Sequence, residues 1–409
     1  MFDFDSIHDR QAWSSTKWVR YQDRDVIPLW IADMDFPVAP AIREALTAYA
    51  QHANFGYRSL PRDLPQLLVD DHRRRYGWAV DPRWIVWLPG LVLGLNLAVK
   101  ACTAPGERVI SFSPVYPPFL QAPALQGRQL VDVPLRPTNA AGTVHAIDFD
   151  LLEEAVRPAA GADGSVPPAT RLLLLCHPHN PIGRVFTRDE LERLAAFCER
   201  HDLLVCSDEV HCDLILDGHT AHHPFARVMA ERSPELLART ITLHGPGKTY
   251  NVAGLGIAWA IIPDAMLRRR FRAAMQKLVP DPCACSYSAL QAVFTSGEPW
   301  RQALLAQLRA NRDRVSAALE RMGLAHSHPE VTYLTWIDAR ALAAEVGNAA
   351  AWFEQHGVGL SDGAEFGRPG YLRLNFAAPR ALLDEALQRM ENAIAAHRQA
   401  APHASGEPA

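Results

Sequence analysis

Residues 171–211 read RLLLLCHPHNPIGRVFTRDELERLAAFCERHDLLVCSDEVH, and this stretch decides the fold. Two short apolar runs, 171–176 and 203–207, lie at its ends, and each has the length of a buried strand. Between them, Thr187 and Glu190 have the spacing of a capping box, and apolar residues then recur at helical intervals. This order of strand, helix and strand predicts one right-handed crossover unit in a parallel sheet.

The sequence on both sides extends this pattern. Apolar runs at 108–112 and 240–244 are also predicted strands, and short apolar runs alternate with helical stretches from about 84 to 263. After about residue 280 the pattern changes to long amphipathic helices and isolated strands. The helices are expected at 300–322 and 380–397, and the strands at 331–337 and 371–376.

We therefore expect an α/β protein in four parts. They are an N-terminal segment packing with the small domain (1–45), a large domain (46–283), a small α+β C-terminal domain (284–399) and a disordered tail (400–409).

Composition excludes several classes of protein. Lys and Arg number 41 against 45 Asp and Glu, and the arginine runs at 73–75 and 268–270 are expected to be solvated helix faces, so no nucleic-acid partner is predicted. No stretch is long and apolar enough for a membrane span, and the acidic N-terminus does not fit a signal or transit peptide. Scattered cysteines favour a reduced, cytoplasmic protein. The Cys283/Cys285 and His177/His179 pairs have no companion pair at zinc-site spacing, so we expect no metal.

Polar side chains follow the predicted strands at the edge where ligands bind in open parallel sheets. They are Tyr116, Asn180, Asp208 with His211, and Lys248. Pyridoxal 5'-phosphate (PLP) requires this inventory: a lysine for a Schiff base, a carboxylate for the pyridine nitrogen, a donor to the phenolic oxygen and a flat group over the ring. Gly90 precedes an apolar helical run, where the N–H groups of Leu91 and Val92 are expected to bind the phosphate.

Each of these residues also has a structural explanation. Tyr116 and Asn180 fit turns, Asp208 fits a helix cap, and His211 fits a hydrogen-bonded polar residue. Gly245-Pro-Gly-Lys248 is like part of a P-loop, but Thr242 occupies the position of the first glycine, which excludes the nucleotide interpretation.

Four motifs together resemble the fold type I PLP enzymes of the class I/II aminotransferase superfamily over nearly the whole chain. They are Asn180-Pro-Ile-Gly183, Ser207-Asp-Glu-Val-His211, Gly247-Lys-Thr-Tyr-Asn-Val-Ala-Gly254 and Tyr371-Leu-Arg-Leu-Asn375. The resemblance implies a PLP-transferase fold, with a PLP-binding large domain built on a mostly parallel central sheet flanked by helices.

The resemblance also implies roles for individual residues. Lys248 is the Schiff-base lysine, Asp208 partners the pyridine nitrogen and Tyr116 stacks on the ring, and these three are the catalytic set. Asn180 donates to the phenolic oxygen and His211 also binds the cofactor. Arg373 holds the substrate carboxylate, with Ala32, Tyr116 and Asn180 beside the substrate. Tyr57 is expected to reach the phosphate of a neighbouring subunit's cofactor, which implies a homodimer with shared active sites.

Three features resemble the cystathionine β-lyase, or C-S lyase, branch (MalY/PatB type). The segment 29–36 matches its N-terminal signature, His211 stands where aminotransferases usually have tyrosine, and Gly256 stands where many have a phosphate-binding arginine. One departure is that Gly245 and Gly247 occupy positions where relatives commonly have phosphate-binding serines. Backbone amides, Tyr57 or His244 are the alternatives for that role.

The expected activity is α,β-elimination on sulfur-containing amino acids, giving a thiol, pyruvate and ammonia. An ordinary thiol has a pKa of about 8.5, so a thiolate leaves readily. Transamination is the first alternative, and a regulatory binding role on the same fold is the second.

Overall fold

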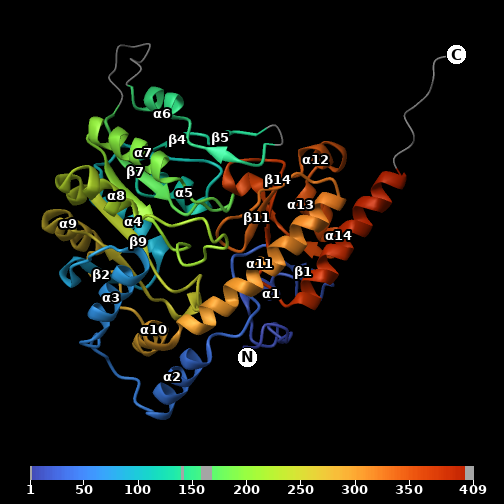
Figure 1. Ribbon diagram of the computed structural model, residues 1–409, viewed down its shortest axis with the longest axis horizontal. Coiled ribbons are helices and arrows are strands. Elements are labelled where there is room, and N and C mark those ends of the chain that lie inside the picture. Colours follow the sequence, from blue (N-terminus) through green and yellow to red (C-terminus); the bar gives the residue numbers. More distant parts are fainter. Residues whose placement is uncertain (1, 140–141, 158–167, 401–409) are drawn as a thin grey trace.

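A central seven-stranded sheet organises the computed structural model, which describes residues 2–139, 142–157 and 168–400. Six strands run in one direction, and β10 is antiparallel to both its neighbours. Figure 1 shows this sheet surrounded by helices. The order across the sheet is β2 (Ile85–Leu88), β10 (Ala258–Ile261), β9 (Thr240–His244), β8 (Leu204–Asp208), β7 (Thr170–Cys176), β3 (Arg108–Ser111) and β4 (Gln129–Asp132). The predicted mostly parallel α/β architecture is confirmed.

Both faces of this sheet are buried by helices. In β7, Leu172 and Leu174 point into one apolar cluster while Leu173 and Leu175 point into another, as the two-residue period of a strand requires. One face packs on α4 (Leu91–Cys102), α5 (Pro117–Leu125) and α9 (Ala265–Met275). The other packs on α6 (Phe149–Val156), α7 (Arg188–Arg200) and α8 (Phe225–Arg232). Because both faces of the sheet are buried, its strands are apolar at consecutive positions and not only at alternate ones.

The helix α7 begins where the sequence predicts. Thr187 accepts a hydrogen bond from the backbone N–H of Glu190, and the Glu190 side chain accepts one from the N–H of Thr187, so the capping box is complete. The crossover from β7 through α7 to β8 thus forms the expected unit, which ends with Asp208 at the edge of the sheet.

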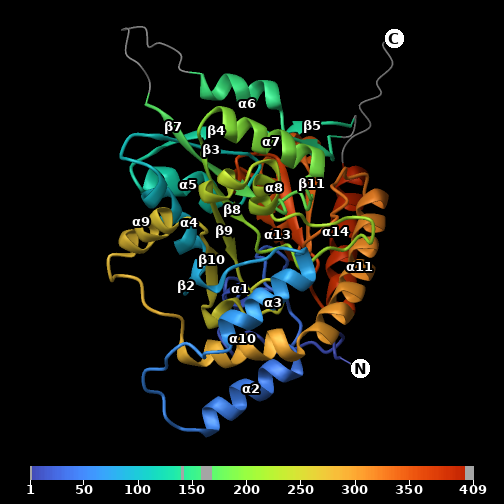
Figure 2. The same ribbon diagram turned by 60° about the vertical axis from the view of Figure 1, so that its left-hand side comes forward.

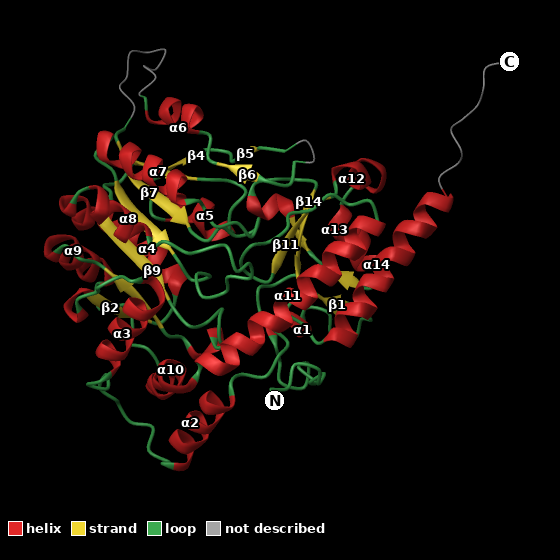
Figure 3. Ribbon diagram, in the orientation of Figure 1, coloured by secondary structure: helices red, strands yellow, loops and turns green. Residues whose placement is uncertain are grey.

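A second, smaller unit follows the sheet, and Figure 3 shows its three-stranded sheet apart from the central one. Its elements are α11 (Glu298–Arg321), β11 (Leu334–Asp338), α12 (Arg340–Val346), α13 (Ala349–Gln355), β12 (Val358–Gly359), β13 (Ser361–Asp362), β14 (Tyr371–Asn375) and α14 (Arg380–Ala400). β14 lies between β11 and β13, antiparallel to both.

Three segments connect the units. β1 (Ile27–Pro28) pairs with β12, so the N-terminal segment lies against the small unit, and α1 (Thr16–Val19) precedes it. α10 (Ala284–Ser296) packs on α2 (Pro40–Gln51) and α3 (Leu64–Tyr76), as both ribbon views show (Figure 2). α10 also contacts α11, so it lies between helices on both sides of the predicted domain boundary at 284, which stays a prediction. The remaining strands, β5 (Arg136–Pro137) and β6 (His145–Ala146), form a short hairpin.

Within the described ranges, no helix has the length and apolar character needed to cross a membrane. The expected tail at 400–409 lies outside the described residues except for Ala400, which ends α14.

Candidate active site

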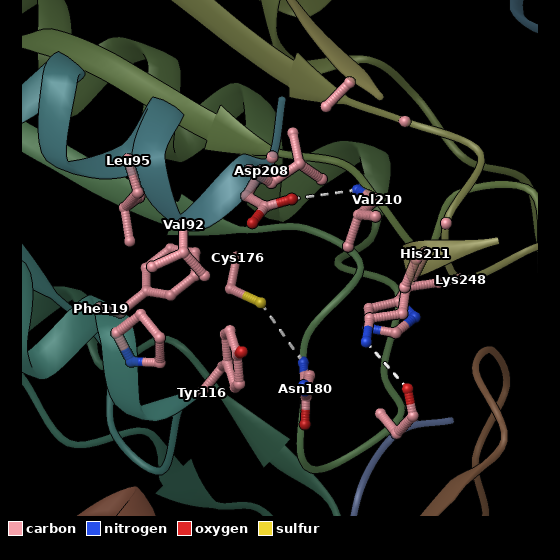
Figure 4. Close-up of a pocket in the computed structure, with 18 of the residues that line it drawn as sticks. Val92, Leu95, Tyr116, Phe119, Cys176, Asn180, Asp208, Val210, His211 and Lys248 are labelled. Atoms are coloured by element: carbon pink, nitrogen blue, oxygen red, sulfur yellow. Dashed lines mark hydrogen bonds between the residues drawn. The ribbon is translucent and has the colours of Figure 1, made fainter. Parts of the chain in front are cut away.

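A cavity of about 210 Å³ lies at the carboxyl ends of β7, β8 and β9. Figure 4 shows Tyr116, Asn180, Asp208 and Lys248 around it. The sequence places each of them just after a strand or at its end, and parallel strands bring these ends to one edge. The other lining residues predicted from the sequence are Ala32, Leu91, Val92 and His211.

Lys248 is held at the mouth of the cavity. Its Nζ donates a hydrogen bond of 2.8 Å to the carbonyl oxygen of Ala32, a residue of the N-terminal segment. Desolvation, followed by the positive charge of Arg373, lowers the pKa of Lys248 to about 8. About a tenth of this amine is therefore neutral at pH 7, a far larger fraction than for an ordinary lysine, and the neutral form is the one that acts as a nucleophile or a base.

Asp208 lies on the sheet side of the same cavity, where burial raises its pKa to about 6. Its Oδ1 accepts a hydrogen bond from the backbone N–H of Val210 at 3.1 Å, which opposes that rise (Figure 4). Because the pKa still lies below 7, the carboxylate is mostly ionised at neutral pH and can stabilise a cation.

The side chains of Asn180 and Arg373 are joined by a hydrogen bond. Arg373 is buried, and its Nη1 donates to Asn180 Oδ1 at 3.2 Å, so the amide nitrogen of Asn180 is the group left to donate elsewhere. Arg373 Nη2 donates to the carbonyl oxygen of Trp30 at 2.8 Å, whereas its buried Nε has no partner among the described residues. Burial lowers the pKa of Arg373 to about 10, so the guanidinium stays charged and available for an anion.

His211 is a neutral ring at this site. Burial, followed by the charges of Lys248 and Arg373, lowers its pKa to about 3. Its Nδ1 is buried without a hydrogen-bond partner in the part of the chain that the structure describes. A buried polar atom is costly without a partner, so this atom indicates a place for a polar ligand group.

The start of α4 lines the cavity with Gly90, Leu91 and Val92. The first hydrogen bond within the helix runs from the N–H of Gly94 to the carbonyl oxygen of Gly90, which leaves the preceding N–H groups free of helical partners. The space beside Gly90 is open, with no atom within 4 Å of where a Cβ would be. A helix N-terminus with free amides favours an anion.

Two predicted cofactor residues do not line the cavity. His244 is buried behind Asp208, where its Nε2 lies 3.2 Å from Cys212 Sγ and 3.6 Å from Asp213 Oδ2. Tyr57 is fully exposed on the loop after α2, away from this chain's own cavity. Among the described residues, Cys212, Asp213 and His244 are the one cluster of metal-ligand types, and Asp213 is already paired with Arg75 at 3.2 Å.

The serine positions that hold glycine are tightly packed. A Cβ at Gly247 would lie 3.2 Å from Ala253 Cα, and one at Gly245 would lie 3.2 Å from Ala258 Cβ. Side chains there would require the neighbouring chain to shift, so backbone amides are the groups that these two positions can offer.

The sequence-based interpretation missed the residues that support the N-terminal segment. Tyr333 donates to the carbonyl oxygen of Ala32 at 3.2 Å, and Asn375 donates to those of Ile31 at 2.7 Å and Asp33 at 2.8 Å. Asn375 is the last residue of the motif Tyr371-Leu-Arg-Leu-Asn375, so the sequence did indicate that this position matters. Tyr333 lies in a predicted strand without distinguishing features.

The chain is similar to known proteins over nearly its whole length. The family model for aminotransferase class I and II matches residues 24–390. Cystathionine β-lyase PatB of Bacillus subtilis (strain 168) is 33% identical over 401 residues, covering 96% of this chain and 99% of that protein. The crystal structure of OvoB is 42% identical with a TM-score of 0.88, covering 99% of this chain and all of that one. A PLP-bound putative aminotransferase from Clostridium difficile 630 is 32% identical with a TM-score of 0.88, covering 96% of this chain and all of that one.

Proposed function

The chain belongs to the aminotransferase class I and II family, and from this premise we propose that it catalyses α,β-elimination on sulfur-containing amino acids. Its cofactor is pyridoxal 5'-phosphate, as in the PLP-bound neighbour. The observation that carries the proposal is the meeting of Lys248, Asp208 and Asn180 around one cavity, with Arg373 bonded to Asn180.

The residues present fit this cofactor. The free amides at the start of α4 would hold the phosphate, and Asp208 would face the pyridine nitrogen. The Asn180 amide nitrogen and the unpartnered His211 Nδ1 would donate to or accept from its polar groups, with Tyr116 against the ring. When bound, the cofactor supplies an aldehyde for amines and a ring that accepts electrons from the α carbon.

Three residues of the chain then have separate roles in the proposed reaction. Arg373 binds the substrate carboxylate, since among the described residues its Nε and one N–H of Nη1 have no acceptor. Lys248 takes the proton from the α carbon as a general base, because its lowered pKa leaves a larger neutral fraction of the amine than an ordinary lysine has. Asp208 stabilises positive charge at the far side of the cavity. The thiolate leaves from the β carbon, and the released three-carbon product hydrolyses to pyruvate and ammonia.

Two observations support elimination over transamination. The chain is similar to cystathionine β-lyase PatB, and the segment 29–36, His211 and Gly256 resemble the C-S lyase branch. The purified protein should release pyruvate and free thiol from L-cystathionine or S-methyl-L-cysteine without any keto acid. A strict requirement for an added keto acid would instead support transamination, which the similarity to the putative aminotransferase keeps as the second candidate.

We also propose that the active enzyme is a homodimer with shared sites. Tyr57 and Phe55 are exposed on the loop after α2, and Arg58 ties that loop to α10 by donating to Ala284 O at 3.0 Å. The exposure of these two aromatic side chains supports the role that the resemblance implies for Tyr57, which is contact with a neighbouring subunit.

Removing the guanidinium at position 373 should weaken substrate use. Arg373→Gln is expected to lower kcat/KM for S-methyl-L-cysteine by about 100-fold or more, since truncating one partner of a buried charge pair costs about 2–5 kcal/mol. Most of the loss should be in KM, because Arg373 binds a carboxylate that is present throughout the reaction. Arg380→Gln, an exposed arginine on α14, is the matched control. Equal kinetics for the two variants would contradict the assignment.

The rate of cofactor capture by the apoprotein should depend on pH. Only a neutral amine attacks the aldehyde, and the pKa of Lys248 is lowered to about 8. The capture rate is therefore expected to rise about tenfold per pH unit below 8 and to level off above it. Stopped-flow absorbance after mixing apoprotein with PLP measures this rate. A rate that keeps rising to pH 10 would show that the amine has an ordinary pKa.

A further inference from the structure

Two cysteines lie next to each other at the start of α10, outside the cavity described above. The Sγ atoms of Cys283 and Cys285 are 3.3 Å apart, and Cys283 is exposed. Neither residue lines the cavity that holds Lys248. Figure 2 shows the chain between α9 and α10 running along the outside of the molecule, which agrees with this exposure.

The other five of the seven cysteines differ from this pair. All of them are buried, and they are Cys102, Cys176, Cys198, Cys206 and Cys212. Burial raises the pKa of each of these thiols, which makes them poor nucleophiles near neutral pH. Reaction of a cysteine with a small molecule from the solvent is therefore expected at Cys283 and Cys285.

The backbone around the two cysteines is held in place by side chains. The carbonyl oxygen of Cys283 accepts hydrogen bonds from the backbone N–H of Ser286 at 2.9 Å and from its Oγ at 2.6 Å. The carbonyl oxygen of Ala284, the residue between the cysteines, accepts from Arg58 Nη1 at 3.0 Å. These bonds fix the turn that brings the sulfur atoms together. The sulfur atoms must still approach from 3.3 Å to the length of a disulfide, about 2.05 Å.

The two thiols differ in the way that a two-step exchange requires. Hydrogen bonds, first from the backbone N–H of Cys285 and then from its thiol, lower the pKa of Cys283, so the exposed sulfur is the more readily ionised one. Burial, followed by the hydrogen bond with Cys283 and the charge of Cys283, raises the pKa of Cys285. When Cys283 bonds to another sulfur atom it loses its charge, so the second thiol then becomes easier to ionise.

We propose that Cys283 and Cys285 form a thiol–disulfide exchange site for low-molecular-weight disulfides. The Cys283 thiolate attacks one sulfur atom of the small disulfide, which forms a mixed disulfide and releases one thiol. Cys285 then attacks Cys283 Sγ, which forms the bond between the two cysteines and releases the second thiol. The two cysteines are oxidised and the small disulfide is reduced. The two protons that the cysteines lose are balanced by the two that the departing thiolates take up.

This exchange goes beyond the proposed elimination and does not depend on it. It uses neither Lys248 nor the cofactor. The oxidised form of the thiol that the elimination releases belongs to the same class of co-reactant. Failure of the exchange would leave the elimination standing, and an absence of pyruvate release would leave the exchange standing.

The test treats the full-length, PLP-loaded protein with bis(2-hydroxyethyl) disulfide and maps the peptides by mass spectrometry. In the unmodified protein, the peptide containing Cys283 and Cys285 is expected to lose two hydrogen atoms and to regain them with dithiothreitol. Cys285→Ser should keep the small thiol on Cys283 as a stable mixed disulfide, because the second attacking sulfur is missing. Cys283→Ser should react about tenfold more slowly, because Cys285 is less exposed and has a raised pKa.

The five buried cysteines serve as the internal control and should remain thiols. The inference is overturned if the pair stays reduced, if the mixed disulfide persists in the unmodified protein, or if the buried cysteines react at the same rate as the pair. Equal reaction rates for Cys283→Ser and Cys285→Ser would also overturn it. If a serine variant does not fold, the unmodified protein decides, since only a reversible bond between Cys283 and Cys285 supports the site.

Discussion

Lys248→Ala is expected to lower kcat for pyruvate release by about 10⁴-fold or more. The variant loses the only side-chain amine among the described residues that line the cavity, and with it both the proposed covalent attachment point and the base that moves the α proton. The Ala32 carbonyl oxygen would keep its bond from Tyr333, so the N-terminal segment should stay in place and the loss should be chemical rather than structural. Steady-state kinetics and the cofactor's absorbance spectrum measure the two roles separately.

Two controls make this result specific. Lys277→Ala removes an exposed lysine beyond α9 and should behave like the unmodified protein. Added methylamine should restore part of the activity of Lys248→Ala by supplying a free amine in the emptied space. Full activity in Lys248→Ala without added amine would refute the assignment of the base.

Asp208→Asn is expected to lower kcat by about 100- to 1000-fold, the effect of removing one partner of a buried charge pair worth about 2–5 kcal/mol. The amide keeps the shape of the carboxylate and can still accept from Val210, but it cannot stabilise a cation opposite Lys248. Asp208→Glu, which retains the charge, should recover part of the loss. Cofactor content, measured after denaturation, distinguishes slower chemistry from weaker binding. Equal activity of Asp208→Asn and the unmodified enzyme would contradict the role of the carboxylate.

The pH dependence of this carboxylate has a defined direction. Burial raises the pKa of Asp208 to about 6 in the free protein, so it becomes protonated as pH falls through 6 and its support for a cation is lost. Cofactor binding by the apoprotein should therefore weaken as pH falls below about 6 in the unmodified protein, as a PLP titration at several pH values would measure, and this acid limb should be absent in Asp208→Asn.

Local sequence patterns predicted the central fold well because both faces of the sheet are buried. Strand β7 is apolar at every position from Leu172 to Cys176, and the capping box of α7 is contained in four residues. The antiparallel strand β10 was not predicted, since strand direction depends on how the chain returns to the sheet and not on its own residues. The packing of α10 on α2 likewise depends on contacts between segments more than 200 residues apart.

Some residues of the candidate site could likewise be predicted from the sequence, and others could not. Residues that follow a strand, such as Asn180 and Lys248, could be predicted because the edge of a parallel sheet collects them. The orientation of His244 toward Cys212 could not be predicted, because a residue at a strand end points to either side of the sheet. The bond from Tyr333 to the carbonyl oxygen of Ala32 could not be predicted either, because no period or motif in the irregular N-terminal segment indicates which side chains it meets.

The central claim is that the amine of Lys248 carries the cofactor, and borohydride reduction followed by peptide mapping tests it most directly. Reduction makes the bond between cofactor and amine permanent, so mass spectrometry then identifies the modified residue. We expect the phosphopyridoxyl group on the peptide containing Lys248 in the PLP-loaded protein. A modification found instead on Lys17, Lys100 or Lys277, with Lys248 unmodified, would contradict the account.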